Sequence, residues 1–70
     1  MRRTTVSSQI IASIGYDIER CRLEVEFRNG WIYEYDDVPT VVHNGLMTAS
    51  SHGRFLKQYI VDTYVTRRIR

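Results

Sequence analysis

The side chains in this sequence that could do chemistry include one cysteine and two histidines. Cys21 is the only cysteine, and His43 and His52 belong to different predicted elements. Neither histidine has a second histidine, a cysteine or a carboxylate at ligand spacing, so we predict no metal site. A nucleophilic Cys21 would need a base nearby, and the sequence supplies no convincing one. On the inner face of a strand, this cysteine would behave as a small hydrophobic residue.

Two short motifs also contain reactive side-chain types. Asp36 and Asp37 are neighbours in the chain, and adjacent residues of a strand point to opposite sides. This pair therefore resembles a strand-end turn more than a catalytic dyad. Segment 50–53 holds two serines and a histidine, and a loop with a helix-capping serine explains it. We predict that the protein is not an enzyme and uses no cofactor.

Basic side chains provide the remaining candidate site. The net charge is only +2, but residues 16–38 carry seven acids against three bases. Residues 51–70 carry five bases against Asp62 alone. A bound polyanion such as RNA should therefore use the C-terminal helix and tail. The alternative interpretation is a solvated surface of mixed charge. The candidate RNA-binding residues are Arg54, Lys57, Arg67, Arg68 and Arg70.

A predicted hairpin forms the centre of the chain. Residues 21–28 alternate between apolar and charged types, which is typical of a half-buried strand. A two-residue loop at Asn29-Gly30 would drive Glu34 into the core, where a charge is costly. A three-residue loop over 28–30 keeps the charges on one face and puts Gly30 in a left-handed conformation. We predict the three-residue loop. Its pairs are Phe27 with Trp31, Val25 with Tyr33, and Leu23 with Tyr35.

In this register three aromatic rings share the face of the hydrophobic ladder. Trp31, Tyr33 and Tyr35 are then predicted to be core or core-rim residues, rather than an open platform on which bases stack. The tyrosine hydroxyls at the rim could still reach solvent or a ligand, because the ring is amphipathic.

The rest of the chain predicts one small α+β domain. Seventy residues, of which 43% are hydrophobic and 26% charged, are ordinary for a single globular domain. Residues 9–14 should form a first strand before the hairpin, and segments 1–8 and 66–70 should be mobile ends. The fold class is therefore a three-stranded antiparallel β-meander followed by two α-helices packed on one face, β-β-β-α-α.

The two predicted helices follow Pro39 and the serines of segment 50–53. Gly45 lies on the inner side of the first helix, where it should permit a close backbone approach. The other inner residues are Val41, Val42, Leu46 and Ala49 in the first helix, and Phe55, Leu56, Tyr59, Ile60 and Thr63 in the second.

Location is suggested only by what the sequence lacks. No apolar run approaches the roughly 20 residues that span a bilayer. The first residues do not resemble a secretory signal. We expect a cytoplasmic protein that does not bind membranes.

An ordered series of short motifs resembles the KTSC domain family. The series includes Ser13-Ile14-Gly15-Tyr16-Asp17, Tyr33-Glu34-Tyr35, Val38-Pro39 and Ala49-Ser50-Ser51-His52-Gly53. The resemblance spans roughly residues 8–66, and it implies a single KTSC-like domain over residues 1–70. The family takes its name from the C-terminal region of some lysyl-tRNA synthetases and also occurs as short bacterial and phage proteins. That association points to RNA and brings no agreed functional residues.

Two functions follow from the sequence. The first is a small non-catalytic module that binds RNA, either tRNA or another structured RNA, through the basic C-terminal helix and tail. The alternative is a protein–protein interaction or homodimerisation module, motivated by the uneven charge and an exposed edge of the first strand.

Overall fold

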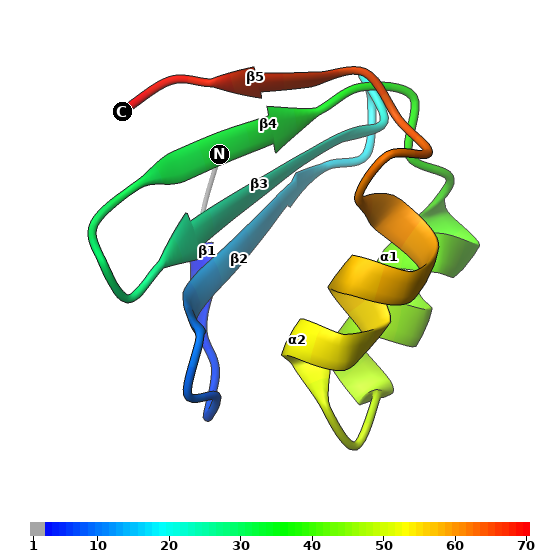
Figure 1. The fold of residues 1–70 in the computed structure, drawn as a ribbon. Helices are drawn as coiled ribbons and strands as arrows, with labels where there is room; N and C mark the ends of the chain where they lie inside the picture. Colours follow the sequence, from blue (N-terminus) through cyan, green and yellow to red (C-terminus); the bar gives the residue numbers. More distant parts are fainter. Residues whose placement is uncertain (1–2) are drawn as a thin grey trace.

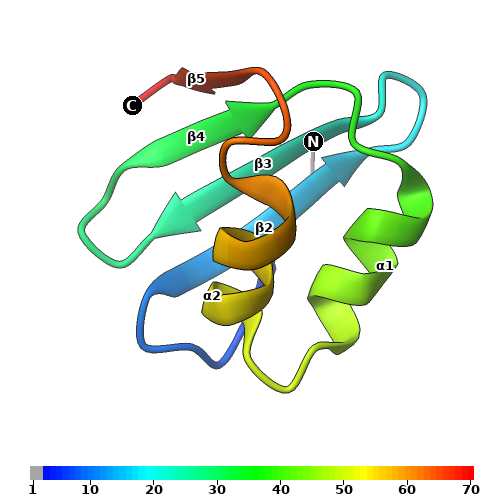
Figure 2. The same ribbon diagram turned by 45° about the vertical axis from the view of Figure 1, so that its right-hand side comes forward.

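One antiparallel sheet and two helical segments make up the computed structural model, which describes residues 3–70 (Figures 1 and 2). The order of the strands across the sheet is the same as their order in the chain. The strands are β1 (Arg3–Thr5), β2 (Ile11–Asp17), β3 (Arg22–Phe27), β4 (Ile32–Tyr35) and β5 (Thr66–Arg68). The helices are α1 (Thr40–Thr48) and α2 (His52–Phe55), and α2 continues as the π-helical turn η1 (Leu56–Ile60). Both helices cover the same face of the sheet, which confirms the α+β class.

The predicted number of three strands is wrong, because the structure has five. β1 and β5 come from segments 1–8 and 66–70, which were expected to be mobile ends; residues 1–2 lie outside the described part of the chain. Each added strand is only three residues long, and neither shows an alternating pattern. Their pairing with β2 and β4 supplies the order that their own sequences do not encode. Since β1 pairs with the outer edge of β2, the strand predicted to be first is not an edge strand, and in the described part of the chain β1 takes that place.

The hairpin of β3 and β4 confirms the three-residue loop. The Phe27 amide donates a hydrogen bond to the Trp31 carbonyl at 2.8 Å, and the Gly30 amide donates to the Phe27 carbonyl at 2.9 Å. Val25 lies opposite Tyr33, as predicted. Gly30 has a φ of +94°, in the region that glycine tolerates best.

The core lies between the sheet and the helices. Its buried residues are Val6, Ile11, Ile14, Leu23, Val25, Tyr35, Val38, Leu46, Leu56 and Ile60. The second helix places Leu56 and Ile60 inward as predicted, but Tyr59 is exposed. In α1 only Leu46 is buried, and the prediction for Val41 is wrong because its side chain is 74% exposed.

The other face of the sheet carries paired charges. Arg3 of β1 lies 3.1 Å from Glu24 of β3. Arg67 of β5 lies 3.0 Å from Glu34 and 2.6 Å from Asp36. The two terminal strands therefore bring arginines beside the carboxylates of the central hairpin, which compensates the acidic face that the sequence predicts.

Two helical details agree with the sequence. The Ser51 hydroxyl oxygen accepts a hydrogen bond from the Arg54 amide at 3.2 Å, so this serine caps α2. A Cβ atom at Gly45 would lie 2.7 Å from Cζ of Phe55, so the glycine permits the close packing of α1 against α2. Among residues 3–70, neither helix is long and apolar enough to cross a membrane.

Candidate functional site

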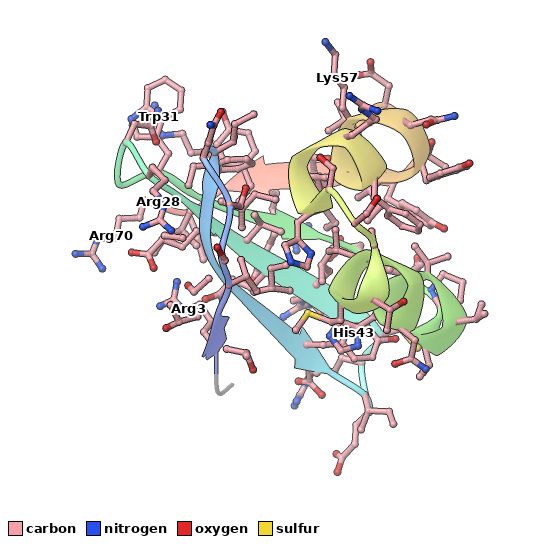
Figure 3. The ribbon with its side chains drawn as sticks, turned by 90° about the horizontal axis from the view of Figure 1, so that it is seen from below. Arg3, Arg28, Trp31, His43, Lys57 and Arg70 are labelled. Atoms are coloured by element: carbon pink, nitrogen blue, oxygen red, sulfur yellow. The ribbon has the colours of Figure 1, made fainter. Side chains whose placement is uncertain are left out.

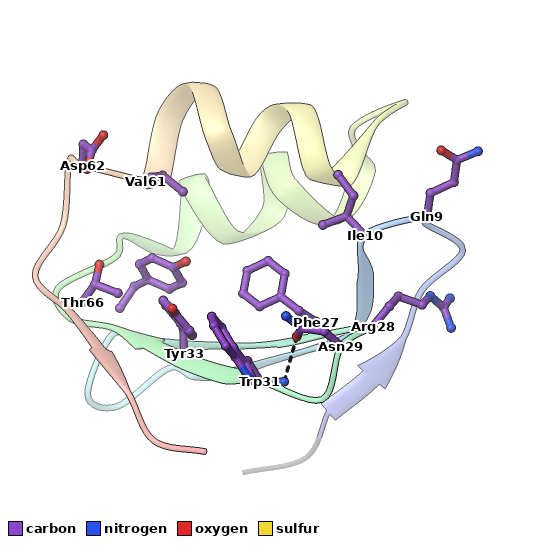
Figure 4. Close-up of a pocket in the computed structure, with 11 residues that line it drawn as sticks. Gln9, Ile10, Phe27, Arg28, Asn29, Trp31, Tyr33, Val61, Asp62 and Thr66 are labelled. Atoms are coloured by element: carbon purple, nitrogen blue, oxygen red, sulfur yellow. Dashed lines mark hydrogen bonds between the residues drawn. The ribbon is translucent and has the colours of Figure 1, made fainter.

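An open cleft of about 610 Å³ lies between the end of the hairpin and the second helix (Figure 4). We call it the aromatic cleft. Its walls are mostly apolar, and their apolar side chains are Ile10, Phe27, Trp31, Tyr33, Tyr35 and Val61. Figure 4 shows the rings of Phe27, Trp31 and Tyr33 rising from the sheet towards the helices.

Strand alternation places the rings of this cleft. Trp31, Tyr33 and Tyr35 lie two residues apart on one face of β4 and its start. Trp31 and Tyr33 have nearly parallel rings, with an interplanar angle of 14° and centroids 6.3 Å apart. Phe27, opposite Trp31 in the hairpin, meets the Tyr33 ring edge-on with centroids 5.6 Å apart. The result is a compact set of rings with a fixed orientation.

The prediction that these rings belong to the core or its rim holds best at one end of the strand. Tyr35 is only 2% exposed, Tyr33 is half-buried, and Trp31 is 43% exposed. Burial also raises the pKa of the Tyr35 hydroxyl to about 12. In Figure 2 the loop that joins β3 to β4 extends beyond the helices. The helices therefore cover Tyr35 and leave the Trp31 end of the same face open.

Arg68 is the predicted site residue that contacts a ring of the aromatic cleft, although it does not itself line the cleft. It is opposite Tyr33 in the β4–β5 pairing, and its guanidinium lies 3.9 Å from the centre of the Trp31 ring. This is the geometry of a cation–π interaction. The sequence predicts neither β5 nor this contact, because segment 66–70 resembles a mobile tail.

Arg67 lies on the opposite face of the sheet from Arg68. Its guanidinium donates two hydrogen bonds to Asp36, at 2.6 and 2.8 Å, and one to Glu34 at 3.0 Å. The Arg67 guanidinium lowers the pKa of the Asp36 carboxyl below its usual value, and the two carboxylates raise the pKa of Arg67. This arginine is therefore engaged by carboxylates and does not border the aromatic cleft.

The remaining predicted residues are spread over the surface. Arg54 lines a second cleft of about 460 Å³, the polar cleft, between segment 50–54 and segment 7–10. Lys57 is exposed on η1 and lines neither cleft. Figure 3 shows Lys57 and Arg70 far apart on the molecule. The structure thus places Arg54 in the wall of the polar cleft and Arg68 against a ring of the aromatic cleft, and it does not bring the five residues together.

The side chains tested for chemistry have structural surroundings. His43 stacks on Tyr16 with ring centroids 4.4 Å apart, and burial lowers its pKa. The Nδ1 atom of His52 lies 2.8 Å from the Leu46 carbonyl oxygen. Cys21 lies in the turn before β3, with a φ of +52°, and not on the strand as predicted. Within residues 3–70, no group of three or more histidine, cysteine, aspartate or glutamate side chains could hold a metal ion.

Three comparisons relate this chain to known proteins. The family model of the KTSC domain matches residues 7–64. An uncharacterized protein of Stutzerimonas stutzeri (strain A1501) is 43% identical over 58 residues, which cover 83% of this chain and 82% of the relative. The crystal structure of a KTSC domain protein from Yersinia pestis has a TM-score of 0.94 and 41% identity. It covers 99% of this chain, and the match covers 97% of that protein.

Proposed function

The chain belongs to the KTSC domain family, and from this premise we propose that it is a small non-catalytic module that binds unpaired segments of RNA in the aromatic cleft. The proposal keeps the class of partner that the sequence suggests. It moves the binding surface from the C-terminal helix and tail to the open cleft lined by the end of the hairpin, by β4 and by the residues that follow η1. Loops and ends of a structured RNA provide the unpaired bases that such a cleft would bind.

The observation that carries the proposal is the exposed ring of Trp31, beside the parallel ring of Tyr33 and beneath the guanidinium of Arg68. Proteins that bind single-stranded nucleic acid combine aromatic rings, on which bases stack, with cations that contact the phosphates. Stacking contributes about 1–3 kcal/mol per base. Of the residues lining the cleft, Asp62 is the only acid, so little negative charge opposes an RNA strand.

The single tryptophan of the sequence makes the proposal directly testable. Stacking of a base on Trp31 should quench its fluorescence when a single-stranded uridine oligonucleotide is titrated into the protein. The variant Trp31→Ala should weaken binding of a labelled oligonucleotide by about 5- to 150-fold, since one stacking contact is lost. Tyr59→Ala is the matched control, because Tyr59 is an exposed aromatic residue that does not line the cleft.

Equal affinities of both variants and the original protein would refute the proposal. So would fluorescence that does not respond to RNA at low salt, where any electrostatic contribution is largest.

A protein-interaction module is the second candidate, and the edge of β5 favours it. β5 is an outer strand of the sheet, and its flanking residues Val65 and Ile69 are 66% and 48% exposed. An unpaired edge with apolar neighbours can add a strand from another chain. A homodimer formed in this way should show twice the monomer mass in light scattering at micromolar concentration. A monomer mass at that concentration would contradict it.

A further inference from the structure

The polar cleft adjoins the aromatic cleft at one end. The two clefts share Gln9, Ile10 and Arg28 in their walls. Figure 4 shows these three residues at the end of the aromatic cleft away from Asp62 and Thr66. A chain molecule lying in one cleft can therefore continue into the other.

The walls of the polar cleft carry positive charge and hydroxyl groups. They contain two arginines, Arg28 and Arg54, and no carboxylate. Four serines also line the cleft: Ser7, Ser8, Ser50 and Ser51. Hydroxyls and guanidinium groups are the donors that proteins use for phosphate oxygens.

Arg28 is held in place at the border of the two clefts. Its Nε donates to the Ser8 carbonyl at 3.0 Å, and its Nη2 approaches the Val6 carbonyl at 3.3 Å. A guanidinium has five N–H donors, so three remain for a ligand after these two bonds. The backbone contacts orient the group without neutralising its charge.

The guanidinium of Arg54 is available to a ligand, since its side chain has no ion pair or hydrogen bond within residues 3–70. Its backbone amide is bonded to the Ser51 hydroxyl oxygen, which still has its own proton to donate. The Ser8 hydroxyl likewise accepts bonds from the Ile10 and Ile11 amides, each at 3.2 Å, and retains a donor. Both hydroxyls are thus oriented by the backbone and have a free O–H.

We infer that the polar cleft binds a phosphate group of the nucleotide chain whose base stacks in the aromatic cleft. This inference rests on the proposed RNA binding and specifies its geometry. Bases lie on Trp31 and Tyr33, and the backbone passes Arg28 towards Arg54. The module would therefore bind two parts of a nucleotide at once, its base in the aromatic cleft and the neighbouring phosphate in the polar cleft.

A comparison of ligands with and without phosphate tests the inference. Uridine, uridine monophosphate and a short uridine oligonucleotide are titrated into the labelled protein, and amide shifts are followed by NMR. The monophosphate should bind more tightly than uridine and shift the amides of segment 50–54, whereas uridine should shift only those of the aromatic cleft. Inorganic phosphate alone should shift segment 50–54 at higher concentration.

The variant Arg54→Gln and its matched control Lys57→Gln remove the same charge from neighbouring exposed positions. Arg54→Gln should weaken oligonucleotide binding about tenfold, as for loss of a charge-assisted hydrogen bond, and abolish the advantage of the monophosphate. Lys57→Gln should change neither, because Lys57 lines no cleft.

The failures of the two proposals differ. If oligonucleotide still quenches Trp31 but Arg54→Gln and Lys57→Gln behave alike, the phosphate site is refuted and RNA binding in the aromatic cleft stands. If no ligand changes the fluorescence of Trp31, the proposed function and the inference built on it both fail.

Discussion

Replacing Arg67 and Arg68 by glutamine, one at a time, separates the two faces of β5. The residues are adjacent in the chain, and strand alternation sends their side chains to opposite faces. Arg68 lies 3.9 Å from the centre of the Trp31 ring, on the side of the aromatic cleft. Arg67 lies 2.6 Å from Asp36, on the outer face. Only Arg68→Gln removes a cation from the proposed RNA surface.

The number of guanidinium groups that contact phosphates determines how steeply the RNA affinity should fall with salt concentration. Three guanidinium groups lie close enough to the proposed site to contact RNA: Arg28 and Arg54 line the clefts, and Arg68 lies against the ring of Trp31. Each phosphate contact of a single strand contributes about 0.7 to the slope of log affinity against log salt, so three predict a slope of about −2. The affinity then falls about 16-fold between roughly 50 and 200 mM salt. All five basic residues predicted from the sequence would give about −3.5 and a fall of about 130-fold.

The assay is fluorescence anisotropy of a labelled uridine oligonucleotide at several salt concentrations, which does not depend on the environment of Trp31. Arg68→Gln should change the slope from about −2 to about −1.4, and Arg67→Gln should leave it near −2. Circular dichroism melting of each variant checks that β5 is retained. An equal reduction by both variants would refute the reasoning, since Arg67 would then leave its carboxylates to contact RNA. A slope near −3.5 would restore the larger basic surface.

Two further predictions concern the helices. Gly45→Ala should gain about 1 kcal/mol of helix propensity but lose about 1–3 kcal/mol to overpacking against Phe55. Urea unfolding should therefore show a net loss of stability. The double variant Gly45→Ala/Phe55→Leu should recover part of this loss, because the smaller side chain relieves the overpacking. Greater stability of Gly45→Ala alone would contradict the contact. Burial lowers the pKa of His43, so the unfolded chain binds more protons, and the free energy of unfolding should fall as pH drops below about 6.5. His43→Gln should flatten the dependence of the unfolding free energy on pH in this range. An unchanged dependence would show that His43 does not cause it.

The hairpin could be predicted from the sequence because several local signals agree. The alternating pattern, the Asn29-Gly30 pair and the cost of burying Glu34 all select one register, and the structure has that register. The capping of α2 by Ser51 and the close approach at Gly45 are local features of the same kind.

The terminal strands could not be predicted, because their order comes from partners and not from their own residues. Arg3–Thr5 and Thr66–Arg68 are short and polar, and each pairs with a strand that the hairpin already positions. This omission also affected the candidate site. Once 66–68 is known to be a strand, alternation alone assigns Arg67 and Arg68 to opposite faces. Without that strand, the sequence predicts that both residues belong to one basic patch.

The hydrophobic pattern of a strand shows which of its residues face inward. Whether those residues become core or line an open site depends on how much of that face the helices cover. Along β4 a single face passes from Tyr35, which is 2% exposed, through Tyr33 to Trp31, which is 43% exposed. At about 3.3 Å per residue these positions span about 13 Å, and the helices cover only the Tyr35 end. The same alternation therefore builds the core at one end of the strand and the aromatic cleft at the other. Sequence periodicity could show that Trp31 points inward, but its exposure depends on how far the helices extend over the sheet, which the residues of the strand do not encode.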